Sequence, residues 1–375
     1  MKIGILTLPF NNNYGGYLQA YALITVLKEM GYEVELIYRR NDRRRKLSLL
    51  WSIIKNCIKI AIGKKVVSFK GNPEVEYRYR GGKMLTFVDK YIEPKTKPFY
   101  SSDEMYQYIS RELDMIIIGS DQVWRPDYGQ KHVQDFFLTE LPSQGPKRIS
   151  YAASFGLDFP CYTEKEIKEC GKAIFNFDAI SVREIRGVDI IREFGWKVKA
   201  DPIVVLDPTF LLPKEHYSSL LLESSSVTKG KIFSYVLDLN NDTNSIVEEL
   251  SKQTGLEVYN IIDTERWLRK DYIMPSLEDW LVGIRDADFV VTDSYHGTVF
   301  SIIFNKPFIT KQNSSRGSTR FESILKRIGL EGRLIQNSAQ VKSALSEDID
   351  WNQVNNILNK EILTSKHYLE CALNY

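Results

Sequence analysis

The sequence predicts an α/β fold with two doubly wound, Rossmann-like domains. Short apolar runs rich in Ile and Val alternate with longer amphipathic stretches, and the alternation starts again after residues 200–212, which contain two Asp-Pro pairs. Strands that alternate with helices in this way form parallel sheets covered by helices. The length of 375 residues also suits two domains of ordinary size better than one.

The N-terminal domain is expected to span residues 1–200. Its strands are predicted at 2–8, 33–38, 115–118, 149–153 and 179–183, and its first helix at 18–30 with Gly31 as C-cap. A polar loop at 11–16 precedes that helix, and its glycines can bring backbone N–H groups close to a ligand. The motifs GxGxxG, GxxxxGKS/T and GxSxG do not occur, which argues against a dinucleotide enzyme, a P-loop hydrolase and a nucleophile elbow.

The C-terminal domain is expected to span residues 201–345. It is predicted to begin with a hinge at 200–212, because the prolines there break regular structure. Strands predicted at 232–237, 257–262, 289–292 and 307–310 alternate with helices predicted at 245–254, 277–285 and 297–304. A last helix within residues 346–375 is expected to pack back on the N-terminal domain.

Composition argues against several classes of protein. Hydrophobic residues make up 43% and charged residues 26% of the chain, as in soluble globular proteins, and the net charge of +2 gives no indication of nucleic-acid binding. The four cysteines form no CxxC pair and no metal-ligand spacing with histidine, so we expect no metal and a reduced, cytoplasmic compartment. We also expect no secretory leader and no segment of the ~18 apolar residues that span a bilayer.

Residues 39–70 form a basic segment with eleven Lys or Arg and a single acid, Asp42. Apolar residues occur between them at helical spacing: Leu49, Leu50, Ile53, Ile54, Ile58 and Ile62. A basic amphipathic helix can lie on an anionic membrane, here at its inner face, but it can equally be a docked surface helix with a solvated basic side. Both interpretations stay open at this point.

The most informative feature for function is the junction between the third strand and the third helix of the C-terminal domain. The strand ends in Thr292-Asp293-Ser294, and His296-Gly297 opens the helix. Ligands bind outside the carboxyl ends of parallel strands, and helix N-termini favour anions. An imidazole at such a junction suggests acid–base chemistry on a phosphorylated or carboxylated substrate.

Five short motifs follow one another over residues 1–330. They are Asn13-Tyr14-Gly15-Gly16, Gly119-Ser120-Asp121-Gln122-Val123-Trp124, Ser181-Val182-Arg183-Glu184, Asp207-Pro208-Thr209-Phe210-Leu211-Leu212 and Thr292-Asp293-Ser294-Tyr295-His296-Gly297. This ordered set resembles the polysaccharide pyruvyl transferase family. The resemblance implies a GT-B-like arrangement with the active site in the cleft between the domains, the acceptor on the N-terminal side and the donor on the C-terminal side. It also implies transfer of the enolpyruvyl-derived group of phosphoenolpyruvate to two hydroxyls of one sugar, which gives a pyruvate ketal.

The sequence departs from that family at one place in the donor site. Family members often carry an Arg two residues before the motif histidine, and here Ser294 stands there. Arg316 and Arg320, on the loop after the next strand, can supply the cation instead. Together with Arg183, Ser294 and Gly297 they form the predicted donor site, because a guanidinium fork matches carboxylate and phosphate. Each arginine could also form a local ion pair or lie at the solvated surface.

Three residues are predicted to carry the catalysis. His296 is the expected general acid or base, although its ring could simply cap the turn. Asp121, at the end of a strand, could accept a sugar hydroxyl or act as a second base, and it could equally cap the next segment. Asp293 could orient His296, or it could simply cap the following helix.

The acceptor is expected to be a saccharide, free or lipid-linked. Its contacts are predicted from Asn13, Tyr14, Gly15, Gly16, Gln122 and Trp124, with the Trp ring suited to stack on a pyranose. No cofactor is expected beyond the donor substrate. Two other functions stay open, namely a nucleotide-sugar glycosyltransferase on the same architecture and a non-catalytic glycan-binding protein. The sequence indicates neither the acceptor sugar nor the oligomeric state.

Overall fold

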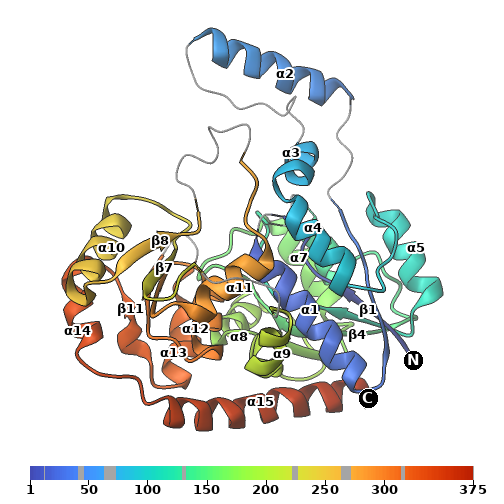
Figure 1. Ribbon diagram of the computed structural model, residues 1–375. Helices are drawn as coiled ribbons and strands as arrows, with labels where there is room; N and C mark the ends of the chain where they lie inside the picture. The colour runs from blue at the N-terminus through green and yellow to red at the C-terminus, as the bar shows by residue number, and fades with distance from the viewer. Residues whose placement is uncertain are drawn as a thin grey trace.

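Two parallel sheets form two α/β domains in the computed structural model of the chain (Figure 1). The structure describes residues 1–11, 13–40, 46–62, 73–128, 132–221, 227–262, 272–313 and 317–374. The N-terminal sheet has the strand order β2-β1-β3-β4-β5-β6, and the C-terminal sheet has the order β11-β10-β9-β7-β8. All ladders between these strands are parallel, which confirms the predicted pair of doubly wound domains.

The strands are short and mostly buried. Those of the N-terminal sheet are β1 (Lys2–Leu6), β2 (Glu33–Leu36), β3 (Met115–Ile118), β4 (Lys147–Ala153), β5 (Ala179–Val182) and β6 (Ile203–Val204). Those of the C-terminal sheet are β7 (Lys231–Tyr235), β8 (Glu257–Asn260), β9 (Phe289–Thr292), β10 (Phe308–Lys311) and β11 (Leu334–Ile335). Continuous apolar runs such as that of β3 fit strands covered by helices on both faces.

Helices cover both sheets. The N-terminal half contains α1 (Tyr14–Glu29), α2 (Lys46–Ala61), α3 (Pro73–Arg80), α4 (Gly82–Tyr91), α5 (Ser102–Glu112), α6 (Val133–Phe137), α7 (Glu164–Ile174), α8 (Ile185–Glu193), the 3₁₀ helix η1 (Pro208–Leu211) and α9 (Lys214–Ser219). The C-terminal half contains α10 (Asn241–Thr254), α11 (Leu277–Asp286), α12 (Tyr295–Ile303), α13 (Thr319–Arg327), η4 (Glu331–Arg333), η5 (Ser338–Gln340), α14 (Val341–Leu345) and α15 (Trp351–Asn374). Capping boxes begin α7, α10 and α11, at Thr163, Asn240 and Ser276.

The first helix begins earlier than the sequence indicates. Tyr14, Gly15 and Gly16 lie in the first turn of α1 rather than in a loop, and Asn13 is the N-cap. Two glycines in one turn disfavour a helix in isolation, so tertiary packing must stabilise this turn. Twelve of the sixteen residues of α1 are buried, which provides that packing.

The segment 200–212, which its prolines predict as a hinge, is a packed connection between the two domains. Ile203–Val204 forms β6, which pairs with β5, and η1 follows directly. All residues from Val205 to Leu212 are buried. The apolar residues between the two Asp-Pro pairs therefore anchor this segment in the core instead of leaving it exposed.

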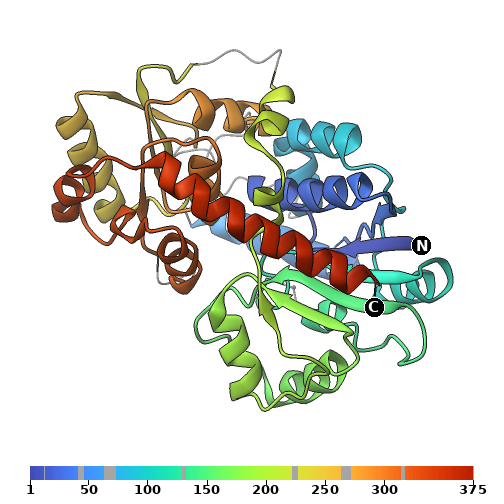
Figure 2. The same ribbon diagram turned by 90° about the horizontal axis from the view of Figure 1, so that it is seen from below.

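Besides the segment 200–212, the two domains are joined at α1 and along α15. The ring of Tyr14 in α1 stacks on Trp280 in α11, with centroids 5.4 Å apart. The long helix α15 runs from the C-terminal domain back across the underside of the N-terminal domain (Figure 2). There the hydroxyl of Tyr368 donates to the carbonyl of Ser150 in β4 at 2.8 Å, and the hydroxyl of Ser365 accepts from the N–H of Leu206 at 3.0 Å.

The basic segment predicted at 39–70 is divided by the structure. Arg39 and Arg40 are buried in the N-terminal domain, so they do not belong to a solvated basic face. Helix α2 forms within the segment, and Figure 1 shows it standing apart from both domains. Residues 41–45 and 63–70 lie outside the described residues. Among the helices that the structure describes, none has the length and apolar character needed to cross a bilayer.

Candidate active site

A cavity of about 480 Å³ lies between the two domains. The N-terminal domain lines it with the loop after β1, the start of α1 and the turn after β3; the C-terminal domain lines it with the ends of β7 and β9 and with residues of α12 and α13. Both sheets therefore direct their carboxyl ends toward the cavity. Ligands bind at this edge in open parallel sheets.

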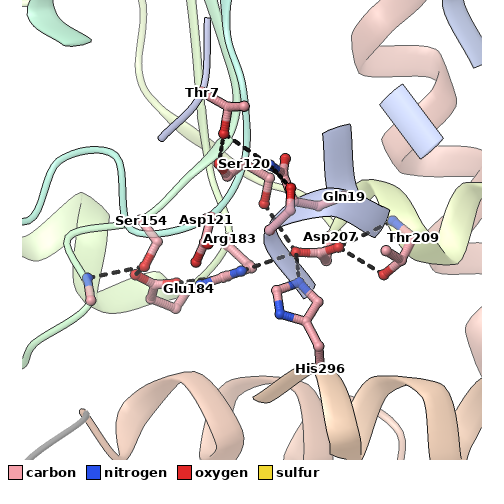
Figure 3. Close-up of polar contacts among 12 residues, drawn as sticks. Thr7, Gln19, Ser120, Asp121, Ser154, Arg183, Glu184, Asp207, Thr209 and His296 are labelled. Carbon is pink, nitrogen blue, oxygen red and sulfur yellow. Dashed lines mark hydrogen bonds and ion pairs between the residues drawn. The ribbon is translucent and has the colours of Figure 1, made fainter. Parts of the chain in front are cut away.

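Asp207 is the centre of a buried polar network beside this cavity (Figure 3). Its Oδ2 accepts hydrogen bonds from Ser120 Oγ and Arg183 Nη1, both at 3.0 Å. Its Oδ1 accepts from the N–H and the hydroxyl of Thr209, at 3.1 and 2.7 Å. His296 Nε2 lies 3.4 Å from Oδ2. The network thus connects the ends of β3, β5 and β6 in one domain to α12 in the other.

Neighbouring cationic groups and hydrogen bonds keep the carboxyl of Asp207 ionised. Burial alone would raise the pKa of this carboxyl, but the charges of His296 and Arg183 and a hydrogen bond from Thr209 lower it well below its usual range. Burial also opposes the charge of Arg183, whereas Tyr295 and Asp207 keep the pKa of that guanidinium above its ordinary value. The carboxylate is therefore a fixed negative charge 3.4 Å from the imidazole.

His296 projects from the first turn of α12 toward the N-terminal domain. The helix starts there because Ser294 caps it, its Oγ accepting from the N–H of Gly297 at 3.4 Å. Gly297 lets α12 approach β9, since a Cβ at this position would lie 2.3 Å from Thr292 Oγ1. Gly15 of α1 faces the imidazole so closely that a Cβ there would lie 1.9 Å from Nδ1. The two glycines thus determine where the imidazole sits.

Two buried guanidinium groups lie over the ring of Tyr295. The distance from Cζ to the ring centroid is 4.2 Å for Arg183 and 5.8 Å for Arg320. Burial, with the nearby charge of Arg183, lowers the pKa of Arg320 to about 10, so this side chain stays cationic at neutral pH. Among the described residues, Arg320 is the arginine that lines the cavity. Arg316 lies outside the described residues.

Asp121 lies on the cavity wall of the N-terminal domain. Its Oδ2 accepts a hydrogen bond from Asn13 Nδ2 at 3.3 Å. Its backbone has φ of 73°, in the left-handed region that residues other than glycine seldom adopt. Such strain persists where the surrounding structure enforces it, and functional sites are a common place for it.

Asp293 lies on the opposite wall, and its carboxylate fixes the loop after β7. It accepts hydrogen bonds from the N–H groups of Leu237 and Asp238, at 2.6 and 2.9 Å. The two tasks proposed for it from the sequence are performed by other side chains. The carboxylate beside His296 is that of Asp207, and the cap of α12 is Ser294.

The sequence profile described as polysaccharide pyruvyl transferase matches residues 13–315. The chain belongs to this family. It is also similar in fold to UDP-N-acetylglucosamine 2-epimerase from Rickettsia bellii, with a TM-score of 0.56 and 12% identity over 100% of this chain and 96% of that one. UDP-GlcNAc 2-epimerase from Neisseria meningitidis bound to UDP-GlcNAc gives a TM-score of 0.54 and 10% identity over 100% of both chains. These structures show a shared GT-B-type fold, and no curated protein matches the chain at a significant level.

Most of the residues that are predicted to contact the saccharide acceptor border the cavity. Asn13, Tyr14, Gly16 and Gln122 line it, whereas Gly15 lies against His296. The amide oxygen of Gln122 accepts a hydrogen bond from Arg125 Nη1 at 3.0 Å, which holds the side chain in the wall.

Trp124 does not reach the cavity, so its predicted stacking on a sugar is corrected. The side chain is 0% exposed, its Nε1 donates to the carbonyl of Phe136 at 3.0 Å, and its ring stacks on Phe137. The core of the N-terminal domain takes up this large apolar ring. Tyr128 lines the cavity with its side chain 37% exposed, and it is the better candidate for a sugar contact.

Tyr14 lines the cavity, but its hydroxyl is already used in a contact between the domains. It donates to the carbonyl of Pro275 at 2.9 Å, and the ring stacks on Trp280. We therefore expect Tyr14→Phe to lower the free energy of unfolding by about 1 kcal/mol, measured by denaturant titration, with the acceptor KM unchanged. Tyr79→Phe, at an exposed position, is the matched control. A raised KM with unchanged stability would show instead that the hydroxyl binds the acceptor.

Asp207 is the main residue of the site that the sequence does not single out. It belongs to one of the five motifs, and it follows a strand-like run, which is the local signal that marks Asp121 and Asp293 as candidates. Its contact with His296 spans 89 positions of sequence and two domains, and no local pattern indicates that pairing. Across the part of the chain that the structure describes, no three His, Cys, Asp or Glu side chains form a group that could hold a metal ion.

Proposed function

We propose that the protein transfers the enolpyruvyl-derived group of phosphoenolpyruvate to two hydroxyls of one sugar and so forms a pyruvate ketal. Membership of the polysaccharide pyruvyl transferase family supports the reaction class. The observation that carries the proposal is the arrangement at one interdomain cavity of His296, the carboxylate of Asp207 and the cationic Arg320. An enol phosphate with a carboxylate requires both a proton donor and positive charge.

The donor is held on the side of α12 and α13. Arg320 lines the cavity there, and the N-terminus of α12 with Ser294 and Tyr295 adds a partial positive charge. The charge of Arg183 is already opposed by Asp207 at 3.0 Å, so its main contribution is to position Asp207 and Tyr295. A cavity of about 480 Å³ is within the range of small-molecule sites.

His296 is the general acid in this proposal. The side chain of His296 lines the cavity, and its Nε2 lies 3.4 Å from Asp207 Oδ2. The ring fills the space that Gly15 leaves by having no side chain, so it is held at the cavity wall and can deliver a proton to the donor from there. Asp207 is a positioning residue, since it fixes the ring and stabilises the imidazolium form.

The reaction balances with these groups. The imidazolium protonates the methylene carbon, which becomes the methyl group and leaves an oxocarbenium-like centre at C2. One sugar hydroxyl adds to C2 and loses its proton, the bond from C2 to the phosphate oxygen breaks, and the second hydroxyl closes the ring. One hydroxyl proton restores His296, and the other leaves on the released hydrogen phosphate. Preorganised charge in the cavity stabilises the cationic centre and the leaving phosphate.

The acceptor occupies the opposite wall in this proposal. Asp121 and Asn13 are hydrogen-bonded to each other there, and Tyr128 exposes part of its ring nearby. Asp121 is suited to take the proton of one attacking hydroxyl, as the second base, and to pass it on to the leaving phosphate. The acceptor sugar is identified by assay rather than by geometry.

An assay of phosphate release distinguishes a pyruvyl transferase from a nucleotide-sugar glycosyltransferase on the same fold. The purified protein is incubated with phosphoenolpyruvate and glycosides of galactose, mannose or N-acetylhexosamines, and inorganic phosphate is measured together with the acid-labile ketal. Acceptor-dependent phosphate release supports the proposal. Release of nucleotide from UDP- or GDP-sugars, with none of phosphate from phosphoenolpyruvate, identifies a glycosyltransferase instead. Glycan binding without turnover of either donor contradicts both.

Arg320→Ala tests the donor site directly. We expect phosphoenolpyruvate to bind about 10- to 100-fold more weakly in calorimetric titration, because one charge-assisted contact to the trianion is lost. Arg192→Ala, at an exposed position of α8, is the matched control and should bind like the wild type. Equal affinities of the two variants would place the donor away from α13.

A further inference from the structure

Helix α2 projects from the molecule with its described side chains in solvent. Figure 1 shows it above α3 and apart from both domains, and every side chain of it whose exposure the structure describes is exposed. Several of these side chains are large and apolar. Their exposed fractions are 57% for Leu50, 69% for Trp51, 47% for Ile54 and 57% for Ile58. A 16-residue helix whose described side chains are all exposed is marginal in water by itself, so a surface outside the chain is needed to cover this face.

The chemistry of α2 is that of a helix lying at an interface. At helical spacing Leu50, Ile54 and Ile58 share one face, and Trp51 lies at its edge. Lys55 and Lys59 continue the row of Trp51, four and eight residues further on, so they flank this apolar face. The helix contains no Asp or Glu. Apolar side chains with an adjacent Trp insert at the level of lipid headgroups, and flanking lysines attract anionic headgroups.

We propose that α2 docks the protein on an anionic lipid surface. Charge complementarity favours an anionic lipid surface over a second copy of the chain, because α2 contains lysines and no Asp or Glu, so a second α2 helix would offer these lysines no opposite charge. The net charge of +2 is small, so the attraction must come from this local group of lysines rather than from the whole protein. The docked helix lies in the interface plane, with its apolar face toward the acyl chains.

The nearest described parts of the chain on either side of α2 lie beside the cavity. Arg40, which precedes the helix, donates from Nη1 to the carbonyl of Phe10 at 3.0 Å, and Phe10 lines the cavity. Its guanidinium also lies 4.9 Å from the ring of Tyr77 in α3, which follows the helix, and the Tyr77 hydroxyl contacts that of Tyr17. Resting on the proposed function, this arrangement places the acceptor wall near the membrane and suits a lipid-linked saccharide.

Vesicle co-sedimentation of the full chain tests the docking independently of catalysis. We expect the protein to pellet with vesicles of phosphatidylcholine and phosphatidylglycerol, and to bind more weakly as salt is added. Ile54→Glu combined with Ile58→Glu should weaken binding by at least about tenfold. Leu363→Glu, at a 68% exposed position of α15 on the opposite side of the molecule in Figure 1, is the matched control and should bind normally.

Replacing the two lysines tests the electrostatic part. Lys55→Gln with Lys59→Gln should weaken binding to anionic vesicles by about 30-fold, and Lys165→Gln with Lys252→Gln, two exposed lysines elsewhere, should not change it. Wild-type protein that stays in the supernatant overturns the proposal. So does a dimer in sedimentation velocity that the Ile54→Glu, Ile58→Glu variant dissociates, because that result assigns the apolar face to a second copy.

Discussion

Replacing Asp207 by asparagine is expected to lower kcat by about 10³-fold without weakening the binding of phosphoenolpyruvate. The variant keeps the shape of the side chain but removes the charge that stabilises an imidazolium 3.4 Å away. Because Asp207 opposes Arg183 as well, its loss leaves more positive charge near the donor, so affinity should stay equal or increase. Steady-state kinetics and calorimetric titration separate these two effects.

The same substitution should change the response of stability to acid. The carboxyl of Asp207 has a lower pKa in the folded protein than in the unfolded chain, where it titrates near about 4. Its stabilising contribution is therefore complete above about pH 4 and is lost as the pH falls toward the folded-state value. Asp207→Asn lacks this contribution, and we expect the melting temperature at pH 7 to be lower and its decline below about pH 4 to be shallower.

Two controls belong to this experiment. Asp201→Asn removes an exposed carboxylate from the same segment, and it should leave kcat and melting temperature unchanged. Ser120→Ala removes one hydrogen bond to Asp207 but keeps the charge, so its kcat should fall by much less than that of Asp207→Asn. A kcat near the wild-type value in a folded Asp207→Asn protein would remove Asp207 from the mechanism.

Gly15→Ala is expected to reduce kcat/KM by at least about 100-fold in a protein that still folds. The added Cβ would lie 1.9 Å from His296 Nδ1, so the imidazole must rotate away or α1 must shift. Displacing a catalytic group by about 1 Å is enough for a loss of this size. The measurement is kcat/KM for phosphate release, with circular dichroism to verify the fold.

The neighbouring glycine provides a matched control for this change. A Cβ at Gly16 would meet its nearest neighbour, Asn13 Nδ2, at 3.5 Å, which is ordinary contact. Gly16→Ala in the first turn of α1 should therefore keep most of the activity and stabilise the protein by about 0.5–1 kcal/mol, through its helix propensity. Equal activities of the two alanine variants would show that α1 does not confine the imidazole.

The fold and one wall of the site could be predicted from the sequence because both depend on local patterns. The junction at His296 is such a case, since a β-branched strand, a capping Ser294 and an apolar helix follow one another within fifteen residues. The alternation of strands and helices likewise gives the two sheets. In each case neighbouring residues contain the information.

Other features depend on contacts between distant parts of the chain. Asp207 and His296 belong to different domains, and so do Tyr14 and Trp280. The position of Trp124 after a strand is compatible with the site and equally with the core, and the burial of a large apolar ring favours the core. The start of α1 at Tyr14 is another example, because packing overrides the low helix propensity of two glycines.

The path of α15 has a consequence for biosynthesis. Its last turns bring Leu369, Ala372 and Leu373 into the same hydrophobic core as Ile3 and Ile5 of β1. The ribosome makes Ile3 and Ile5 long before these residues of α15, although domains ordinarily fold as units as they emerge. The core of the first domain is therefore closed only after α15 has been made, and until then the nascent chain exposes apolar surface.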